Sequence, residues 1–207
     1  MRETYSLGMA SRYDRSMAHF FPRFKRLAFN DSSLQPGDRV LVFCCGTGLD
    51  FPHILERIGS GGEIVGVDLS SHMLDKARDK ITRKKWDNIR LIQDDVTEFR
   101  RDPEERFDTG VCTLGMSIIP DYKAAYSNLV SHVRRNGEVI IGDMQLASGP
   151  FAWLNRITVS LAKRYGGTHQ GHQNSAELRA MMEADLTDVR TRELFARSYF
   201  YCIGKTR

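Results

Sequence analysis

Short apolar runs alternate with amphipathic stretches along most of the chain. Five of these runs are continuously apolar, a pattern typical of strands buried on both faces of a parallel sheet. They occupy residues 39–44, 63–67, 88–92, 108–114 and 138–144. Pro36-Gly37 and Gly61-Gly62 precede the first two runs and mark their beginnings.

The stretches between the runs have helical periodicity at 51–58, 71–84 and 122–133. In the second of these, Ser71 follows the strand and is expected to cap the helix. Met73, Leu74, Ala77 and Ile81 then share one apolar face. This alternation predicts an α/β fold with a doubly wound parallel sheet.

The last third of the chain has a different pattern. Helices are predicted at 151–164 and 175–183. Two β-rich runs follow at 188–195 and 198–204, with a short connection around Ala196-Arg197, and they predict a closing antiparallel hairpin. No repeat, low-complexity tract or linker divides the 207 residues, so we expect a single domain over 1–207.

A glycine loop follows the first predicted strand. Cys45-Gly46-Thr47-Gly48 leads into the helix at 51–58, and ligands bind at such strand ends in open α/β sheets. A dinucleotide-binding loop would need a third glycine where this chain has Phe51, and the phosphate-binding G-x-x-x-x-G-K-[ST] motif is absent. These departures count against an NAD-dependent oxidoreductase, which we keep as a distant alternative.

Acidic residues end the next two strands. Asp68 lies twenty residues after Gly48, where a carboxylate can accept hydrogen bonds from both hydroxyls of an adenosine ribose. The alternative is that Asp68 only begins the cap of the next helix. At the third strand, Asp94-Asp95-Val96 can bind the adenine amino group through one acid and a ring nitrogen through the backbone. The alternative there is a solvated turn, which we expect for one of the two acids.

Together these motifs resemble the class I S-adenosylmethionine-dependent methyltransferases. The entry to the fourth strand at Arg106-Phe107-Asp108 and the fifth strand at 137–141 fit the same pattern, and the likeness covers about residues 9–204. The resemblance implies a seven-stranded, mostly parallel sheet that ends in the antiparallel hairpin, with S-adenosyl-L-methionine as cofactor and S-adenosyl-L-homocysteine as product. The segment 9–14 and the aromatic ending 197–204 are similar to the ubiquinone/menaquinone C-methyltransferases and the bacterial phospholipid N-methyltransferases.

The cofactor residues implied by the resemblance gather at the predicted strand ends. They are Tyr13, Cys44, Cys45, Gly46, Thr47, Gly48, Asp68, Leu69, Met73, Asp94, Asp95, Val96, Thr113 and Leu114.

The sequence departs from the family pattern in three places. Val42 replaces the usual acid of the first strand, and Cys44 replaces the first glycine, so another group or a water must hold the ammonium end of the ligand. Arg135-Asn136-Gly137 replaces Pro-Gly-Gly before the fifth strand. The residues 115–118 lack the Arg and Asn of quinone methylators, while 117–122 resemble other small-molecule and lipid methyltransferases.

The acceptor side offers Tyr13, His169 and His172 as catalytic candidates. The two histidines lie in a glycine-rich stretch, so the alternative is a solvated loop; the glycines argue against a helix there, and we predict no metal site. Tyr13 and Asp14 are expected to close over the donor, or else to pack the first helix.

Two basic, aromatic amphipathic stretches, 12–29 and 151–165, flank the sheet region. We expect an N-terminal helical lid over 1–35 and a helical acceptor-side insertion over 145–185. Contact with an anionic membrane is the alternative, and the two roles are compatible when the acceptor is a lipid.

Composition narrows the function less than the motifs do. The net charge is +4 with a pI near 8.9, which suits acidic small molecules, anionic membranes or nucleic acid alike. The Asn-Pro-Pro-aromatic motif of amino-group DNA methylators is absent, so no nucleic-acid substrate is expected. The four cysteines form no C-x-x-C pair and are expected to be reduced thiols, three of them buried.

The sequence has no apolar N-terminal run and no stretch of about 18 apolar residues, so we expect a cytoplasmic protein, with peripheral membrane contact as the alternative. We expect it to methylate a small-molecule or lipid acceptor, with N-methylation of an amine or phospholipid headgroup favoured. The alternatives are quinone-type or other C- or O-methylation and a non-catalytic module that binds S-adenosylmethionine. The pattern does not indicate an oligomeric state.

Overall fold

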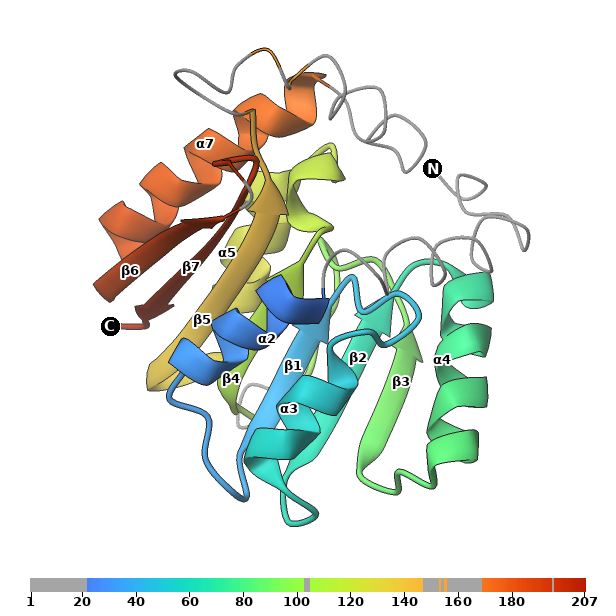
Figure 1. The fold of residues 1–207 in the computed structure, drawn as a ribbon. Coiled ribbons are helices and arrows are strands. Elements are labelled where there is room, and N and C mark those ends of the chain that lie inside the picture. Colours follow the sequence, from blue (N-terminus) through green and yellow to red (C-terminus); the bar gives the residue numbers. More distant parts are fainter. Residues whose placement is uncertain (1–21, 103–104, 147–152, 154, 156–168, 195) are drawn as a thin grey trace.

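The computed structural model describes residues 22–102, 105–146, 153, 155, 169–194 and 196–207. These residues form a seven-stranded sheet in the order β3-β2-β1-β4-β5-β7-β6 (Figure 1). β1 to β5 pair in parallel, whereas β7 is antiparallel to both β5 and β6. The strands are β1 (Arg39–Phe43), β2 (Glu63–Asp68), β3 (Ile89–Gln93), β4 (Phe107–Thr113), β5 (Val133–Met144), β6 (Thr187–Leu194) and β7 (Tyr199–Lys205).

Helices cover both faces of the sheet (Figure 1). α2 (Pro22–Asp31), α3 (Phe51–Ile58) and α4 (Ser71–Lys84) pack on one face, where Phe29, Phe51 and Leu74 join a buried apolar cluster. α5 (Tyr122–His132) and α7 (His169–Asp185) pack on the other face, where Leu129 and Met182 join a second cluster. A short 3₁₀ turn, η1 (Met116–Ile118), follows β4. The result is a three-layer α/β sandwich with the sheet in the middle.

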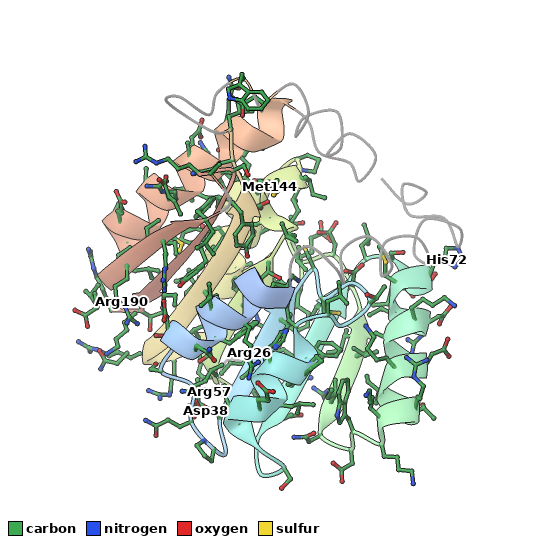
Figure 2. The ribbon with its side chains drawn as sticks, in the orientation of Figure 1. Arg26, Asp38, Arg57, His72, Met144 and Arg190 are labelled. Atoms are coloured by element: carbon green, nitrogen blue, oxygen red, sulfur yellow. The ribbon has the colours of Figure 1, made fainter. Side chains whose placement is uncertain are left out.

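The strand order reverses between β1 and β4, because β2 and β3 extend from one side of β1 and β5 from the far side of β4. This is the switch point at which open α/β sheets bind ligands, outside the carboxyl ends of the strands. In Figure 2, Met144 and His72 mark this carboxyl edge, and Asp38 and Arg57 mark the opposite edge.

The predicted fold class and all seven predicted strands are confirmed, the last two as the antiparallel hairpin. The three central helices are also confirmed, and the predicted apolar face of α4 is buried at Met73, Leu74 and Ala77. Several boundaries differ. The residues 135–137, expected as a loop, lie within β5, which begins at Val133 and accommodates Asn136 at φ 57° next to a register shift against β4.

The helix cap of α4 is one residue earlier than predicted. Ser70 has extended backbone and its hydroxyl accepts a hydrogen bond from the Met73 N–H at 3.4 Å, whereas Ser71 is already the first helical residue. The prediction of Ser71 as the cap was therefore wrong: two residues, Leu69 and Ser70, lie between the end of β2 and α4, and Ser70 is the one that precedes the first helical residue.

The prediction that the glycine-rich stretch around His169 is not helical was also wrong. α7 begins at His169, six residues before the predicted start. Tertiary contacts stabilise this first part of the helix, because Asn174 Nδ2 donates to the Ser117 carbonyl at 2.8 Å and Ser175 Oγ donates to the Met144 carbonyl at 2.7 Å. Propensity alone cannot register such contacts.

The helix predicted at 151–164 lies almost entirely outside the described residues. The lid over 1–35 and the insertion over 145–185 stay predictions; of these ranges, α2 and α7 are the helices that the structure describes. Among the described helices, none is long and apolar enough to cross a bilayer.

Candidate functional site

The loop between β1 and α3 turns sharply at three residues with positive φ. Cys44, Gly46 and Gly48 have φ angles of 51°, 53° and 74°. At Gly48 a side chain is excluded by space as well as by conformation, because a Cβ would lie 2.5 Å from the ring of the fully buried Phe51. A Cβ on Gly46 would meet no protein atom closer than 4.0 Å. The loop therefore presents bare backbone at the carboxyl end of β1.

Asp68 joins this loop to the end of β2. Its Oδ2 accepts a hydrogen bond from the Gly46 N–H at 2.8 Å, and its Oδ1 accepts one from the Ser70 N–H at 2.9 Å. Burial raises the pKa of Asp68, and the two N–H donors oppose that rise. Asp68 therefore holds the glycine loop against β2, and each oxygen keeps a further lone pair for a hydroxyl donor.

The end of β3 is tied to the same edge, because the Asp94 N–H donates to the Asp68 carbonyl at 3.2 Å. Asp95 acts as a turn cap, with Oδ1 accepting from both the N–H and the hydroxyl of Thr97. Asp94 Oδ1 accepts from the Asp95 N–H. Each carboxylate keeps one oxygen that accepts no hydrogen bond from a described residue, so the geometry leaves both available to an adenine amino group.

The remaining predicted cofactor residues differ in exposure. Leu69 is exposed, while Met73, Val96 and Cys45 are buried. Leu114 directly follows β4 and has a φ of 58°, and its N–H donates to the Gly142 carbonyl at 2.7 Å. The structure thus gathers the predicted residues of the four strand ends along one edge of the sheet, while Tyr13 lies outside the described residues.

The hydroxyl of Thr113, also predicted as a cofactor residue, forms hydrogen bonds with two charged side chains that the sequence did not indicate as part of the site. Lys25 of α2 and Asp50 of the β1–α3 loop form a buried ion pair, with Nζ and Oδ1 3.0 Å apart. The Thr113 hydroxyl accepts from Lys25 Nζ at 2.8 Å and donates to Asp50 Oδ2 at 2.5 Å. The only sequence signal was an acid two residues after Gly48, which is equally typical of a helix cap.

The side of the sheet where we predict the acceptor to bind is built from η1, the end of β5 and the start of α7. Asp143 is buried and accepts hydrogen bonds from the N–H groups of Ser117 and Met144, both at 2.9 Å or less. Burial raises the pKa of Asp143. The backbones of His169 and His172 lie in the first turn of α7, whose Asn174 contacts η1. Their catalytic roles stay predictions.

The cysteines near the loop do not have the properties of nucleophiles. A hydrogen bond with the Cys44 thiol and burial raise the pKa of Cys112, and burial raises the pKa of Cys45. All four cysteines are free, with Cys45, Cys112 and Cys202 buried. Protonated, buried thiols are weak nucleophiles and poor metal ligands. Within the part of the chain that the structure describes, no group of three metal-binding side chains converges.

These features fit S-adenosylmethionine. An adenosine needs hydrogen-bond partners along the strand ends from the switch point toward β3. The chain offers the bare backbone at Gly46, the remaining lone pairs of Asp68 and the acids after β3 in that order. At the other end of the same loop, Asp50 Oδ1 is ion-paired with Lys25 and accepts no hydrogen bond from the described residues.

Comparisons with known proteins agree with this geometry. A family model described as "Methyltransferase domain" matches residues 40–137, which run from β1 into β5. The demethylmenaquinone methyltransferase of Geobacillus sp. (strain WCH70) is 28% identical over 108 residues, which are 52% of this chain and 46% of that protein. The aklanonic acid methyltransferase DauC of Streptomyces sp. (strain C5) is 28% identical over 145 residues, which are 70% of this chain and 66% of that protein. The chain thus spans about half the length of the demethylmenaquinone methyltransferase that it matches.

Solved structures share the fold at lower identity. A SAM-dependent methyltransferase from Aquifex aeolicus has a TM-score of 0.70 at 14% identity, covering 98% of this chain and all of that one. The Haemonchus contortus phosphoethanolamine N-methyltransferase 2, solved in complex with S-adenosyl-L-methionine, has a TM-score of 0.72 at 15% identity, covering 99% of this chain and 58% of that one. The matched domain, the shared fold and the strand-end motifs together show that residues 40–137 carry a methyltransferase domain and that the fold is the one shared with S-adenosylmethionine-dependent methyltransferases.

Proposed function

We propose that this chain binds S-adenosylmethionine along the carboxyl edge of β1, β2 and β3 and transfers its methyl group to a small-molecule or lipid acceptor at the ends of β4 and β5. The observation that carries the proposal is the pair of hydrogen bonds that Asp68 accepts from Gly46 and Ser70. They fix the glycine loop and leave lone pairs on both carboxylate oxygens for the ribose hydroxyls. The matched domain and the S-adenosylmethionine-bound structural neighbour support the donor.

Methyl transfer requires the protein to position the donor and the acceptor, and it does not require a strong base. The bound donor supplies a methyl group activated on a sulfonium sulfur. The carbon–sulfur bond breaks as the acceptor atom forms its own bond to the carbon, so the chain must align the acceptor opposite the sulfur and exclude water. A neutral amine acceptor becomes a methylammonium and then releases its extra proton to solvent.

For the acceptor, we favour an amine, such as a phospholipid headgroup. The residues 115–118, three of which form η1, lack the Arg and Asn of quinone methylators. A quinone-type acceptor is the second candidate, because several curated relatives are demethylmenaquinone methyltransferases. The matched domain, 40–137, covers the donor half of the fold, so those names support the donor more directly than the acceptor.

A two-stage experiment tests the proposal. Calorimetry with S-adenosylhomocysteine first measures donor binding, and radiolabelled S-adenosylmethionine is then offered with phosphatidylethanolamine vesicles, phosphoethanolamine and a demethylmenaquinone in parallel. Label transfer to an amine supports the favoured acceptor, and transfer to the quinone replaces it with the second candidate. Tight binding without transfer to any acceptor, with S-adenosylmethionine left intact, contradicts an enzymatic role in favour of a binding module.

Membrane contact is tested separately. Because a lipid acceptor would place the chain at an anionic surface, it should sediment with phosphatidylglycerol-containing vesicles, and added salt should release it. Full activity on a water-soluble acceptor with no sedimentation would contradict the lipid hypothesis.

A further inference from the structure

A buried cluster of opposite charges occupies the switch point. Lys25 comes from α2, Asp50 from the loop after β1 and Thr113 from the end of β4, and the side chains of Lys25 and Asp50 are each only 6% exposed. Because β1 and β4 are the strands between which the order reverses, the cluster lies where this type of sheet binds ligands.

The cluster is incomplete as a purely structural unit. Asp50 Oδ2 is satisfied by the Thr113 hydroxyl, but Oδ1 lies at ion-pair distance from Lys25 and accepts no hydrogen bond from the described residues. Asp50 precedes α3, yet its side chain does not cap that helix. Asp50 Oδ1 thus has the charge of Lys25 beside it but no aligned hydrogen-bond donor, so it can accept a hydrogen bond from a ligand.

The neighbouring carboxylates on this edge differ from Asp50. Both oxygens of Asp68 accept backbone N–H groups, and so do both oxygens of Asp143. β1 itself ends in the buried apolar residues Val42 and Phe43, so no carboxylate from that strand reaches the switch point. Of the three carboxylates Asp50, Asp68 and Asp143, Asp50 is therefore the one with an oxygen that accepts no hydrogen bond from a described residue.

We propose that Asp50 and Lys25 bind the amino-acid end of S-adenosylmethionine, with Asp50 accepting the ligand's ammonium and Lys25 facing its carboxylate. The inference rests on the proposed function and assigns a part of its donor site. A zwitterion brings one charge of each sign, and the buried pair offers the two complementary charges in the same place. Thr113, bonded to both side chains, is the positioning residue of this subsite.

The test compares two ligands that share the adenosine and the thioether. S-adenosylhomocysteine has the amino-acid end, and 5′-deoxy-5′-methylthioadenosine lacks it. Asp50→Asn should weaken S-adenosylhomocysteine by about 10- to 100-fold, the loss typical of a charge-assisted hydrogen bond, and should change methylthioadenosine affinity by less than about twofold. Calorimetry on the full chain measures both dissociation constants.

Asp31→Asn is the matched control. Asp31 is the last residue of α2, the helix that carries Lys25, and it contacts Arg192 of β6 and the Tyr201 hydroxyl of β7 at the opposite end of the sheet from β2 and β3. The control removes the same charge and another tether between α2 and the sheet, so it should leave both affinities unchanged even if it lowers stability.

A second variant covers the case in which Asp50→Asn leaves an unpaired lysine and does not fold. Lys25→Met combined with Asp50→Leu replaces the whole ion pair by apolar groups, a change that folds commonly tolerate. It should show the same selective loss of S-adenosylhomocysteine. Equal loss of both ligands, or loss of neither, would overturn the assignment. A wild-type chain that binds neither ligand would instead show that the proposed function itself fails.

Discussion

The glycine loop can be tested by adding one methyl group at each of its two glycines. Gly46→Ala and Gly48→Ala place the same Cβ at similar positive φ angles, 53° and 74°, so both variants carry the left-handed strain of about 1–2 kcal/mol. They differ in what the new methyl group meets. At Gly46 the nearest protein atom is a carbonyl oxygen at 4.0 Å, and at Gly48 it is the Phe51 ring at 2.5 Å.

The clash sets the size of the difference. Phe51 is fully buried between α3 and the sheet, so its ring cannot move away without disturbing the core. Overpacking of this kind costs about 1–3 kcal/mol, which makes Gly48→Ala less stable than Gly46→Ala by that amount. For a chain of this length the difference corresponds to roughly 2–12 °C in Tm.

Urea denaturation followed by circular dichroism, without ligand, measures the free energy of unfolding of both variants and the wild type. Equal destabilisation by the two substitutions would refute the packing argument at Phe51. A Gly48→Ala variant as stable as the wild type would refute the loop conformation itself.

Two further predictions address the helix cap and the buried histidine. Ser70→Ala should lower the free energy of unfolding by about 1 kcal/mol, whereas Ser71→Ala should change it by less than about 0.5 kcal/mol, because only Ser70 caps α4; thermal denaturation of both variants checks this, and the reverse order would contradict the assignment. Burial lowers the pKa of His132, so the unfolded chain binds the proton more readily, and the free energy of unfolding should fall as the pH drops from 7.5 to 6.0. In urea titrations, His132→Gln should reduce this dependence of the free energy of unfolding on pH by at most about 1.4 kcal/mol per pH unit. A smaller dependence should remain from His53, because burial also lowers the pKa of His53. An unchanged dependence in His132→Gln would contradict the prediction.

Much of the fold follows from the sequence because parallel strands buried on both faces are continuously apolar. The first strand could be predicted from Val40 to Phe43 alone, and all four of these residues are fully buried in the structure. The face of α4 was equally clear, because Met73, Leu74 and Ala77 have helical spacing. These signals are local, so one sequence is enough to detect them.

The features that the sequence did not predict depend on contacts between distant residues. The first turn of α7 contains Gly171, which disfavours a helix, and the helix is stabilised there because Asn174 and Ser175 contact η1 and β5. The Lys25–Asp50–Thr113 cluster joins positions 63 and 88 residues apart. No local periodicity encodes such a pair, and the two charges look like ordinary solvated residues until the fold brings them together.

The central claim is that the ends of β1 and β2 bind the adenosine of S-adenosylmethionine through Asp68. Calorimetric titration of the wild-type chain and of Asp68→Asn with S-adenosylhomocysteine tests it most directly, with circular dichroism showing that the variant is folded. The account predicts one site per chain in the wild type and an affinity at least about tenfold weaker in the variant, because an amide nitrogen replaces one acceptor oxygen. A folded wild type that binds no S-adenosylhomocysteine, or a folded Asp68→Asn that binds it equally well, would contradict the account.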